Sequence, residues 1–324
     1  MDRAKYDSVA VLVPCYNEAL TIGEVIDRYK NALPGAIIYV FDNDSEDGTR
    51  AIALEKSAIV RDVFHKGKGN VIRRMFADVD AEIYVLVDGD NTYHAESAPL
   101  MVNKLVSEQL DMVVGVRMAG ESAAYRAGHK FGNKLLTKFM AIIFGKFFTD
   151  MLSGYRVFSR RFVKTFPAHS SGFETETELT IHALELKMPV AEHPTLYRSR
   201  PIGSSSKLNT IRDGFRILVT IIKIFAVEKP LLFFGSGFVL CNLTAVILAF
   251  PILRTFYETG LVPRIPTAIL SSALVLLGGL CFACGIILDV VTRGRKESKR
   301  FAYLSIPSPR QHVGKGIASD CKDK

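Results

Sequence analysis

The sequence predicts an α/β domain with a doubly wound sheet, followed by a two-helix transmembrane region. Short apolar runs alternate with longer stretches of helical periodicity between residues 8 and 200. Polar or acidic clusters come directly after several of these runs, where a doubly wound sheet binds its ligands. Nearer the C-terminus, two charge-free stretches of 23 and 24 residues are each long enough to cross about 30 Å of hydrocarbon.

Five apolar runs are expected to form strands, and the four periodic stretches between them are expected to form helices. The strands are expected at residues 9–13, 36–41, 59–63, 83–87 and 112–116. The helices are expected at residues 18–33, 48–56, 69–79 and 96–109. Because strands of such a sheet end along one edge, the polar clusters that follow them should lie together.

The two charge-free stretches, 231–253 and 265–288, are expected to be membrane helices. A buried hairpin in a soluble protein is the alternative, but soluble helices seldom run this long without a polar stripe. Five basic residues lie between 293 and 300, and the positive-inside rule places them in the cytoplasm. Both termini are then cytoplasmic, on an integral protein of the cytoplasmic (inner) membrane.

These features divide the chain into four expected parts. They are the α/β domain at 1–208, an amphipathic juxtamembrane helix at 209–229, two membrane helices at 230–292 and a basic cytoplasmic tail at 293–324. A second amphipathic segment, 130–148, alternates basic and apolar residues at helical spacing, as do helices that lie at a membrane surface. Ordinary core packing is the alternative for both amphipathic segments.

The charge distribution argues against a nucleic-acid-binding protein. The net charge is +8, and residues 293–324 contain nine basic and three acidic residues, which leaves the preceding chain nearly neutral. A protein that binds nucleic-acid phosphates should carry its positive charge on a folded face. The five cysteines are odd in number and scattered, so we expect a reducing compartment and no disulfide framework.

Three polar clusters follow the first, second and fourth expected strands. Their candidate residues are Pro14, Tyr16, Asn17 and Glu18, then Asp42 and Asp44, then Asp88, Gly89 and Asp90. Two carboxylates on either side of a glycine suit a hard divalent cation that also binds substrate phosphates. A simple Asp-Gly turn is the alternative reading of the third cluster.

A glycine-rich turn, His-Lys-Gly-Lys-Gly-Asn at 65–70, follows the third strand and opens a helix. Backbone amides at a helix start, together with Lys68 and Gly69, can receive a phosphate group. The turn lacks the Gly-Lys-Ser/Thr ending of a P-loop, which excludes an ATPase of that class.

Taken in order, these motifs resemble glycosyltransferase family 2, which has the GT-A (Rossmann-like) fold. The matching stretches are residues 13–18, 42–49, the Lys-Gly-Lys-Gly turn, 88–90 and Leu-Ser-Gly-Tyr-Arg at 152–156. The stretch 200–208, followed by two membrane helices, resembles more narrowly the polyprenyl-phosphate hexosyltransferases, a group that includes dolichol-phosphate mannose synthases.

The resemblance implies a nucleotide-sugar donor and Mg²⁺ or Mn²⁺ as the cofactor. It implies that Asp88 and Asp90 hold the metal, while some relatives add a glutamine where this chain has Asn91 and Thr92, so the third ligand stays open. The residues assigned to donor binding are Pro14, Tyr16, Asn17, Glu18, Asp42, Asp44, Lys68, Gly69, Asp88, Gly89, Asp90 and Glu174. Glu174 and Glu176 alternate at an expected helix start, and Glu174 is chosen for contact with the sugar hydroxyls, with stabilisation of the helix start as the alternative.

The acceptor implied by the resemblance is a polyprenyl phosphate. Its second pKa is about 6, so it is already a dianion at neutral pH and needs cations rather than a general base. By similarity to the family, the residues assigned to the acceptor phosphate are Arg117, Arg126, Arg200, Ser206 and Lys207. The candidate catalytic residues are Asp150, Arg117 and Arg126. Asp150 would act either as a base or as an orienting group, and the ionised acceptor favours orientation.

The expected function is therefore inverting transfer of a hexose to polyprenyl phosphate, with UDP-glucose as the first choice of donor. GDP-mannose and UDP-N-acetylglucosamine remain alternatives. A processive polysaccharide synthase is less favoured, because the chain has no tryptophan for the Gln-x-x-Arg-Trp signature of those enzymes. A non-catalytic nucleotide-sugar-binding scaffold at the membrane is a further alternative. Small residues near 235–237 and 278–279 offer a surface for a homo-oligomer.

Overall fold

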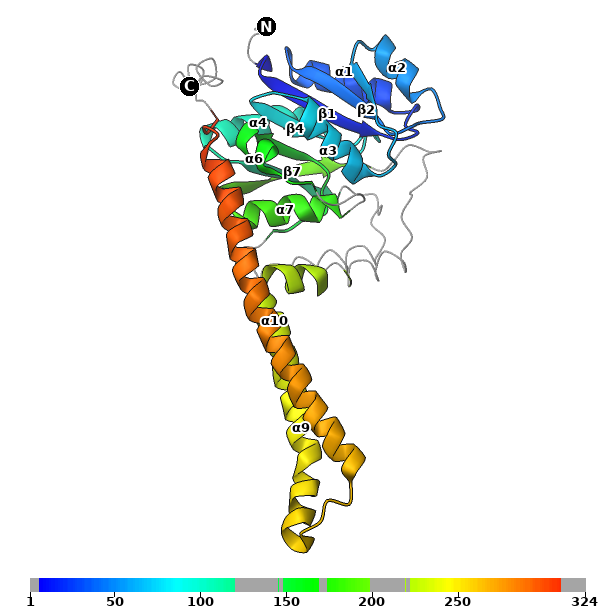
Figure 1. The fold of residues 1–324 in the computed structure, drawn as a ribbon. Helices are drawn as coiled ribbons and strands as arrows, with labels where there is room; N and C mark the ends of the chain where they lie inside the picture. Colours follow the sequence, from blue (N-terminus) through cyan, green and yellow to red (C-terminus); the bar gives the residue numbers. More distant parts are fainter. Residues whose placement is uncertain are drawn as a thin grey trace. The chain divides into compact units, whose positions relative to one another are not determined.

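The computed structural model describes residues 6–119, 145, 148–168, 174–198, 219 and 222–309. The chain divides into two compact units, Met1–Gly214 with Lys299–Lys324, and Phe215–Ser298. The first unit contains a mixed sheet covered by helices, and the second contains a pair of long helices (Figure 1).

The sheet has seven strands in the order β3-β2-β1-β4-β6-β5-β7. The strands are β1 Val9–Cys15, β2 Ile37–Asp42, β3 Ile59–Asp62, β4 Ile83–Leu86, β5 Met112–Ala119, β6 Arg156–Ser159 and β7 Val190–Tyr197. β6 runs antiparallel to β4 and β5, whereas the other pairings are parallel. The carboxyl ends of β1, β2, β3 and β4 consequently meet at one edge, as expected from the sequence.

The five predicted strands and four predicted helices are present, with ends that differ by a few residues. The helices of this unit are α1 Ile22–Ala32, α2 Thr49–Glu55, α3 Lys68–Asp78, η2 Ala95–Ser97, α4 Ala98–Ser107, α6 Arg160–Thr165 and α7 Thr175–Glu185. Sequence reasoning did not anticipate β6 and β7. β6 is only four residues long and starts with a buried arginine, and β7 contains Glu192, His193 and Pro194, so neither has a strand-like pattern.

Both faces of the sheet are buried, which explains the nearly continuous apolar runs of β1 and β4. Alternate residues Val9, Val11 and Val13 of β1 lie in the core cluster that also holds apolar residues of α1 and α4. On the other face, Phe76 of α3 makes edge contacts with Tyr84 and with Phe158, at ring-centroid distances of 6.4 and 5.8 Å. This three-layer packing fixes the strand ends from which the site is built.

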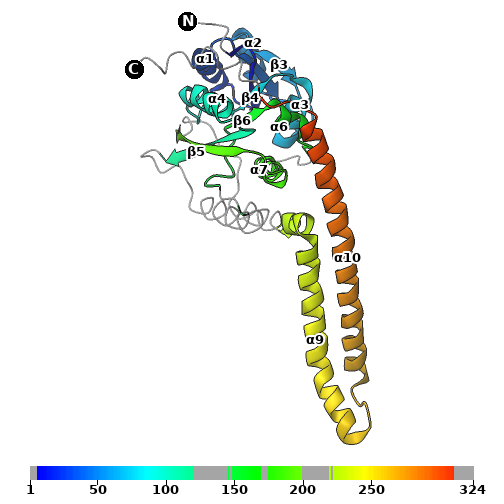
Figure 2. The same ribbon diagram turned by 90° about the vertical axis from the view of Figure 1, so that its left-hand side faces the viewer.

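The second unit holds α9, Pro230–Thr259, and the larger part of α10, Ile265–Leu304, which run side by side in both views (Figure 1, Figure 2). Both are long and apolar enough to cross a membrane, with mean hydropathy of 2.2 and 2.5 in their most apolar windows, of which 6% and 11% is buried. They contain the two predicted spans and indicate association with a membrane.

Small residues bring the two helices together. A Cβ at Gly278 would lie 2.5 Å from Asn242 Nδ2, and the backbone of Gly285 lies against Phe234. Ser271 Oγ also donates to the carbonyl of Ala245 at 2.9 Å. Gly278, expected from the sequence to serve association between copies, thus packs within the pair.

The segment expected as a basic tail begins as helix, because α10 continues to Leu304. Its last turns belong to the first unit. Lys299 pairs with the buried carboxylate of Glu185 at 2.6 Å, and the hydroxyl of Tyr303 donates to Asp111 at 2.8 Å. Basic residues of this segment, such as Lys299, therefore help to fix the end of α10 on the α/β unit.

Candidate active site

The loops after β1 and β2 are joined by hydrogen bonds. The Asn17 amide nitrogen donates to Ser45 Oγ at 2.9 Å, and Asn17 Oδ1 accepts from the amide of Glu46 at 2.9 Å. Asn17 adopts a left-handed conformation with φ of 54°, which asparagine tolerates better than most residues. The buried Asp42 carboxylate accepts bonds from the amide and the hydroxyl of Ser45. Asn17 and Asp42 thus fix the loops after β1 and β2, from which the sequence predicts part of the donor site.

The β1 loop also contacts the loop after β4. Thr21 Oγ1 donates to the carbonyl of Gly89 at 2.7 Å, and the amide of Glu18 donates to Thr49 Oγ1 at 2.9 Å. A Cβ at Gly89 would lie 2.8 Å from Cys15 Sγ, closer than non-bonded carbon and sulfur approach. Glycine is therefore required where the acidic loop passes the end of β1.

The glycine-rich turn is positioned by a buried asparagine that the sequence reasoning did not single out. Asn43 Nδ2 donates to the carbonyls of Val63 and His65 at 2.8 and 2.9 Å, and Asn43 Oδ1 accepts from Gly67 N at 2.7 Å. Gly67 has φ of 124°, which only glycine adopts readily. These bonds fix the start of α3, where Lys68 projects.

The remaining donor candidates lie near this edge. Pro14 pairs with β2 inside the sheet, and Gly69 is buried in the first turn of α3. The Lys66 ammonium lies 5.1 Å from the centre of the Tyr16 ring and 3.6 Å from Asp44 Oδ2. Tyr16 and Asp44 therefore belong to the same rim of the site, and Lys66 joins it.

The centre of the site is an ammonium between two carboxylates. Lys68 Nζ lies 2.5 Å from Asp88 Oδ1 and 2.6 Å from Glu176 Oε1, with the Lys68 side chain only 14% exposed. Burial lowers the pKa of Lys68, but the charges of Asp88 and Glu176 outweigh it and the net pKa is raised. Lys68 is therefore a permanent cation at neutral pH.

It is Glu176, rather than the predicted Glu174, that contacts Lys68. Glu174 is the residue before α7, which confirms the predicted helix start, whereas Glu176 is buried in the first turn. Side chains two residues apart on a helix point in different directions, so only one of the two could reach Lys68. The alternating glutamates of the sequence could not show which.

The residues around Asp88 fit a divalent cation. Asp88 Oδ1 already binds a cationic group, and a Cβ at Gly154 would lie 2.5 Å from Asp88 Oδ2, so that glycine keeps the second oxygen accessible. Asp90 is buried, and its Oδ1 accepts bonds from the amide and hydroxyl of Thr92 at 3.2 and 2.6 Å. Hard oxygen ligands of this kind suit Mg²⁺ or Mn²⁺.

Within the described part of the chain, no third carboxylate joins Asp88 and Asp90. Among the residues that the structure describes, no group of three His, Cys, Asp or Glu side chains is arranged to hold a metal. Asn91 Oδ1 accepts from Arg28 Nη1 at 2.9 Å, and the Thr92 hydroxyl donates to Asp90. Asn91 and Thr92 therefore have other partners at the place where some relatives carry a glutamine.

Arg117, near the end of β5, forms a two-pronged ion pair with Asp150. Arg117 Nε donates to Asp150 Oδ2 at 2.6 Å and Nη2 donates to Oδ1 at 2.8 Å. Asp150 is buried, and Thr149 beside it bonds twice to Glu192 of β7. Both carboxylate oxygens of Asp150 thus accept bonds from the guanidinium, an arrangement that orients Arg117.

Two tyrosines link the carboxylate centre to this ion pair. The Gly154 amide, next to Asp88, donates to Tyr93 Oη at 3.0 Å. The rings of Tyr93 and Tyr197 lie 5.3 Å apart, and the Arg117 guanidinium lies 5.6 Å from the Tyr197 ring. The pKa of Tyr93 is raised by burial and is also affected by the charges of Arg117 and Asp88. The two predicted parts of the site therefore adjoin.

The loop that carries Gly154 is held by a fully buried arginine. Arg156 donates to the carbonyls of Ser153 and Met151 at 3.0 and 2.6 Å and to Thr180 Oγ1 of α7 at 2.9 Å. Burial lowers the pKa of Arg156 to about 10, so the side chain stays charged at neutral pH. Sequence analysis used this residue only as part of a motif, and its burial explains why the motif needs an arginine.

Four acceptor candidates, Arg126, Arg200, Ser206 and Lys207, lie outside the described residues. The same holds for most of the two amphipathic segments, 130–148 and 209–228. Of the predicted acceptor set, Arg117 alone is described.

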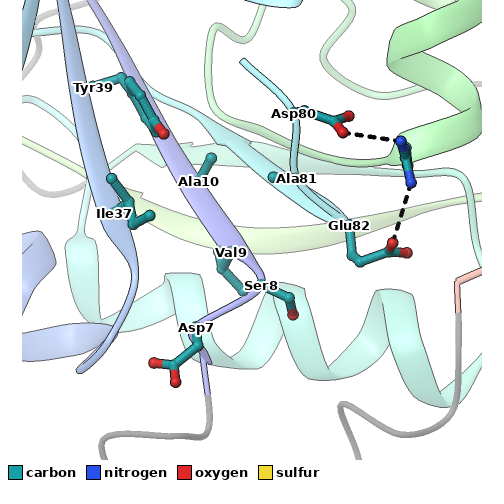
Figure 3. Close-up of a pocket in the computed structure, with 10 residues that line it drawn as sticks. Asp7, Ser8, Val9, Ala10, Ile37, Tyr39, Asp80, Ala81 and Glu82 are labelled. Carbon is teal, nitrogen blue, oxygen red and sulfur yellow. Dashed lines mark hydrogen bonds and ion pairs between the residues drawn. The ribbon is translucent and has the colours of Figure 1, made fainter.

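A hollow of about 220 Å³ lies at the opposite end of the strands (Figure 3). It is lined by the first residues of β1 and β2, including Val9 and Ile37. Asp80 and Glu82 on its wall pair with Arg160 at 3.0 and 3.5 Å. Because ligands of such sheets bind at the carboxyl ends of the strands, we assign this hollow no part in the site.

Comparison with known proteins agrees with this arrangement. The family model described as Glycosyl transferase family 2 matches residues 10–166. Glycosyltransferase AglJ of Haloferax volcanii is 33% identical over 92% of this chain and 98% of its own length. The dolichyl-phosphate hexose transferase of the same organism is 25% identical over 71% of this chain and 99% of its own.

A solved structure shares the fold. It is glucosyl-3-phosphoglycerate synthase of Mycobacterium tuberculosis in complex with Mn²⁺, UDP-glucose and phosphoglyceric acid, with a TM-score of 0.52 and 21% identity over 68% of this chain and 81% of that chain. The seven-stranded mixed sheet is thus the GT-A fold that the motifs predict. With the AglJ match spanning nearly all of both proteins, the chain belongs to glycosyltransferase family 2.

Proposed function

We propose that this glycosyltransferase moves a hexose from a nucleoside diphosphate to a polyprenyl phosphate, with inversion at the anomeric carbon. The observation that carries the proposal is that Tyr93 and Tyr197 link two differently charged parts of one site. A carboxylate centre built around Asp88 adjoins a partly buried guanidinium, Arg117, in a chain with two helices apolar enough for a membrane. A membrane-borne phosphate would need this combination.

The donor half would bind a nucleotide-sugar diphosphate. Asp88 and Asp90 would hold Mg²⁺ or Mn²⁺, which would offset negative charge on the departing diphosphate. UDP-glucose is the first choice of donor, and the structural relative that holds UDP-glucose with Mn²⁺ supports testing it first. GDP-mannose and UDP-N-acetylglucosamine are the alternatives for the same acceptor.

The acceptor half would bind the lipid phosphate. A phosphate monoester with a second pKa of about 6 is largely a dianion at neutral pH, so it needs no base to become a nucleophile. Arg117 would attract it, and Arg126, Arg200, Ser206 and Lys207 would complete its site. The relative named dolichyl-phosphate hexose transferase supports this class of acceptor.

Asp150 would act by orientation rather than as a base. Both of its oxygens accept bonds from Arg117, which holds the guanidinium in one direction. Catalysis would then rest on alignment of the lipid phosphate with the anomeric carbon and on charge placement around the diphosphate.

The topology proposed from the sequence places the catalytic unit in the cytoplasm. Arg293, Arg295 and Lys296 follow the apolar part of α10, and the positive-inside rule assigns them to the cytoplasmic face. The sugar lipid would then be made on the cytoplasmic face of the inner membrane.

The test is a transfer assay with the full-length protein in detergent. The protein is mixed with Mn²⁺, dispersed polyprenyl phosphate and one labelled donor at a time: UDP-glucose, GDP-mannose or UDP-N-acetylglucosamine. We expect labelled lipid with UDP-glucose, lost on addition of a chelator. Labelled lipid with another donor would correct the sugar, and donor binding without product from any donor would favour the non-catalytic scaffold.

A further inference from the structure

The position of Lys68 raises a question about how the metal reaches Asp88. The Lys68 ammonium lies 2.5 Å from Asp88 Oδ1, a full hydrogen-bonded ion pair. A divalent cation bound to the same carboxylate would stand close to this ammonium, and two positive charges at such separation repel strongly where water is excluded. Lys68 and the metal therefore compete for Asp88.

Glu176 is placed to hold Lys68 whether or not Asp88 does. Its Oε1 lies 2.6 Å from Lys68 Nζ, and the residue is 5% exposed. Its other oxygen, Oε2, is buried with no hydrogen-bond partner among the described residues. A buried carboxylate oxygen without a hydrogen-bond partner destabilises the site. Movement of the ammonium, or a hydroxyl of a bound ligand, would supply that oxygen with a donor.

Lys68 can make such a move because of its place in the chain. It is the first residue of α3, directly after Gly67, and its flexible side chain reaches the site with the ammonium at its tip. Lys68 also stands at the start of a helix, where a phosphate group is favourably received. An ammonium released from Asp88 would find phosphate oxygens nearby.

We propose that Lys68 is a built-in counter-cation that occupies Asp88 in the free enzyme and exchanges with the divalent metal when the donor binds. In the free state it neutralises the repulsion between Asp88 and Glu176, and in the bound state it stays with Glu176 and pairs with the diphosphate. The inference rests on the proposed function for the identity of the donor. It makes Lys68 and Glu176 a pair whose removal improves binding of the metal alone.

The test is binding of Mn²⁺ alone, followed by binding of UDP with Mn²⁺ present, measured by titration calorimetry on the full-length protein in detergent. In Lys68→Met we expect Mn²⁺ alone to bind on the order of tenfold tighter than in the wild type, because its competitor is gone. We expect UDP with Mn²⁺ to bind on the order of tenfold more weakly, because a charged partner of the diphosphate is lost.

A matched double variant separates occupancy from net charge. Lys68→Met with Glu176→Gln removes one positive and one negative charge, so the site keeps its net charge while Asp88 loses the ammonium. Tighter binding of Mn²⁺ in this variant than in the wild type would support the exchange. Affinity equal to or weaker than that of the wild type would overturn it. If UDP binds equally well to the single variant, the proposal that the Lys68 ammonium moves to the diphosphate is overturned.

These measurements use no lipid, so they are independent of the acceptor assignment. Thermal unfolding of each variant checks that it is folded, and the double variant, with a near-isosteric and neutral pair, keeps the test valid if the single variant unfolds. Failure of the proposed function would instead appear as absence of labelled lipid from the wild-type protein.

Discussion

The end of α10 provides a quantitative test of the packing in the catalytic unit. Tyr303 is 6% exposed, and its hydroxyl donates to Asp111, which is fully buried and also accepts bonds from Ser159 and Arg161. The ring lies between the guanidinium groups of Arg161 and Arg300, at 4.7 and 4.9 Å from the ring centre. Tyr303→Phe keeps these ring contacts and removes only the bond to a charged acceptor.

The expected cost follows from that single bond. A hydrogen bond to a charged group contributes about 1.5–3 kcal/mol, and Asp111 keeps its other partners, so we expect a loss of about 2 kcal/mol. For a unit of roughly 200 residues this lowers Tm by about 4–8 °C. The assay is thermal unfolding of the full-length protein in detergent, with intrinsic tyrosine fluorescence or circular dichroism as the signal.

The control is the same chemical change elsewhere in the chain. Tyr257 is 86% exposed, so Tyr257→Phe should change Tm by less than about 1 °C. A shift for Tyr303→Phe no larger than that of the control would refute the argument that the last turn of α10 is an integral part of the catalytic unit.

Three further predictions follow from the described contacts. Gly89→Ala should destabilise the protein by about 1–3 kcal/mol, because the new Cβ clashes with Cys15 Sγ. Adding Cys15→Ala should remove most of that cost. If the losses of stability of the two single variants simply add in the double variant, the clash is not the cause. Burial and then the charge of Lys299 lower the pKa of His182 to about 3, so its contribution to stability is complete above about pH 6.5 and is lost toward pH 3. The free energy of unfolding, measured with urea, should therefore fall by about 2 kcal/mol more between pH 7 and pH 5 in the wild type than in His182→Gln. If the unfolding free energies of the two proteins change in parallel with pH, His182 is not the cause. Asp150→Asn should lower kcat roughly 100-fold, because Arg117 is then held less firmly in its orientation. The dependence of the rate on pH should still follow ionisation of the acceptor phosphate. A rate that instead follows a much higher pKa would show that Asp150 acts as a base.

Much of the fold could be predicted because local pattern and tertiary structure agree. Strands buried on both faces, such as β1 and β4, appear as unbroken apolar runs, and their spacing gives the alternating order. The strand β6 could not be predicted, because its buried arginine is stabilised by the carbonyls of the preceding loop and by Thr180 of α7, contacts that no sequence pattern shows. The end of α10 was expected as a tail, since its charges have partners only in three dimensions.

The residues of the site likewise fall into those that the sequence pattern shows and those that depend on tertiary contacts. Residues at strand ends, such as Asp42 and Asp88, are visible in the sequence because parallel strands end at one edge of the sheet. Asn43 was missed because it acts through backbone carbonyls, and Glu174 was preferred to Glu176 because the partner of Glu176, Lys68, lies more than 100 residues away. Spacing alone could not distinguish Glu176 from Glu174 on α7.

The most direct measurement is lipid labelling by the variant in which Asp88 and Asp90 are both alanine. Asp80→Ala with Glu82→Ala is the matched control, because these carboxylates have the same spacing and lie at the other end of β4, paired with Arg160. We expect the control to label polyprenyl phosphate at a rate close to that of the wild type, and the Asp88 and Asp90 variant to give no product above background although it remains folded. Undiminished labelling by that variant would contradict the assignment of these carboxylates to the reacting centre.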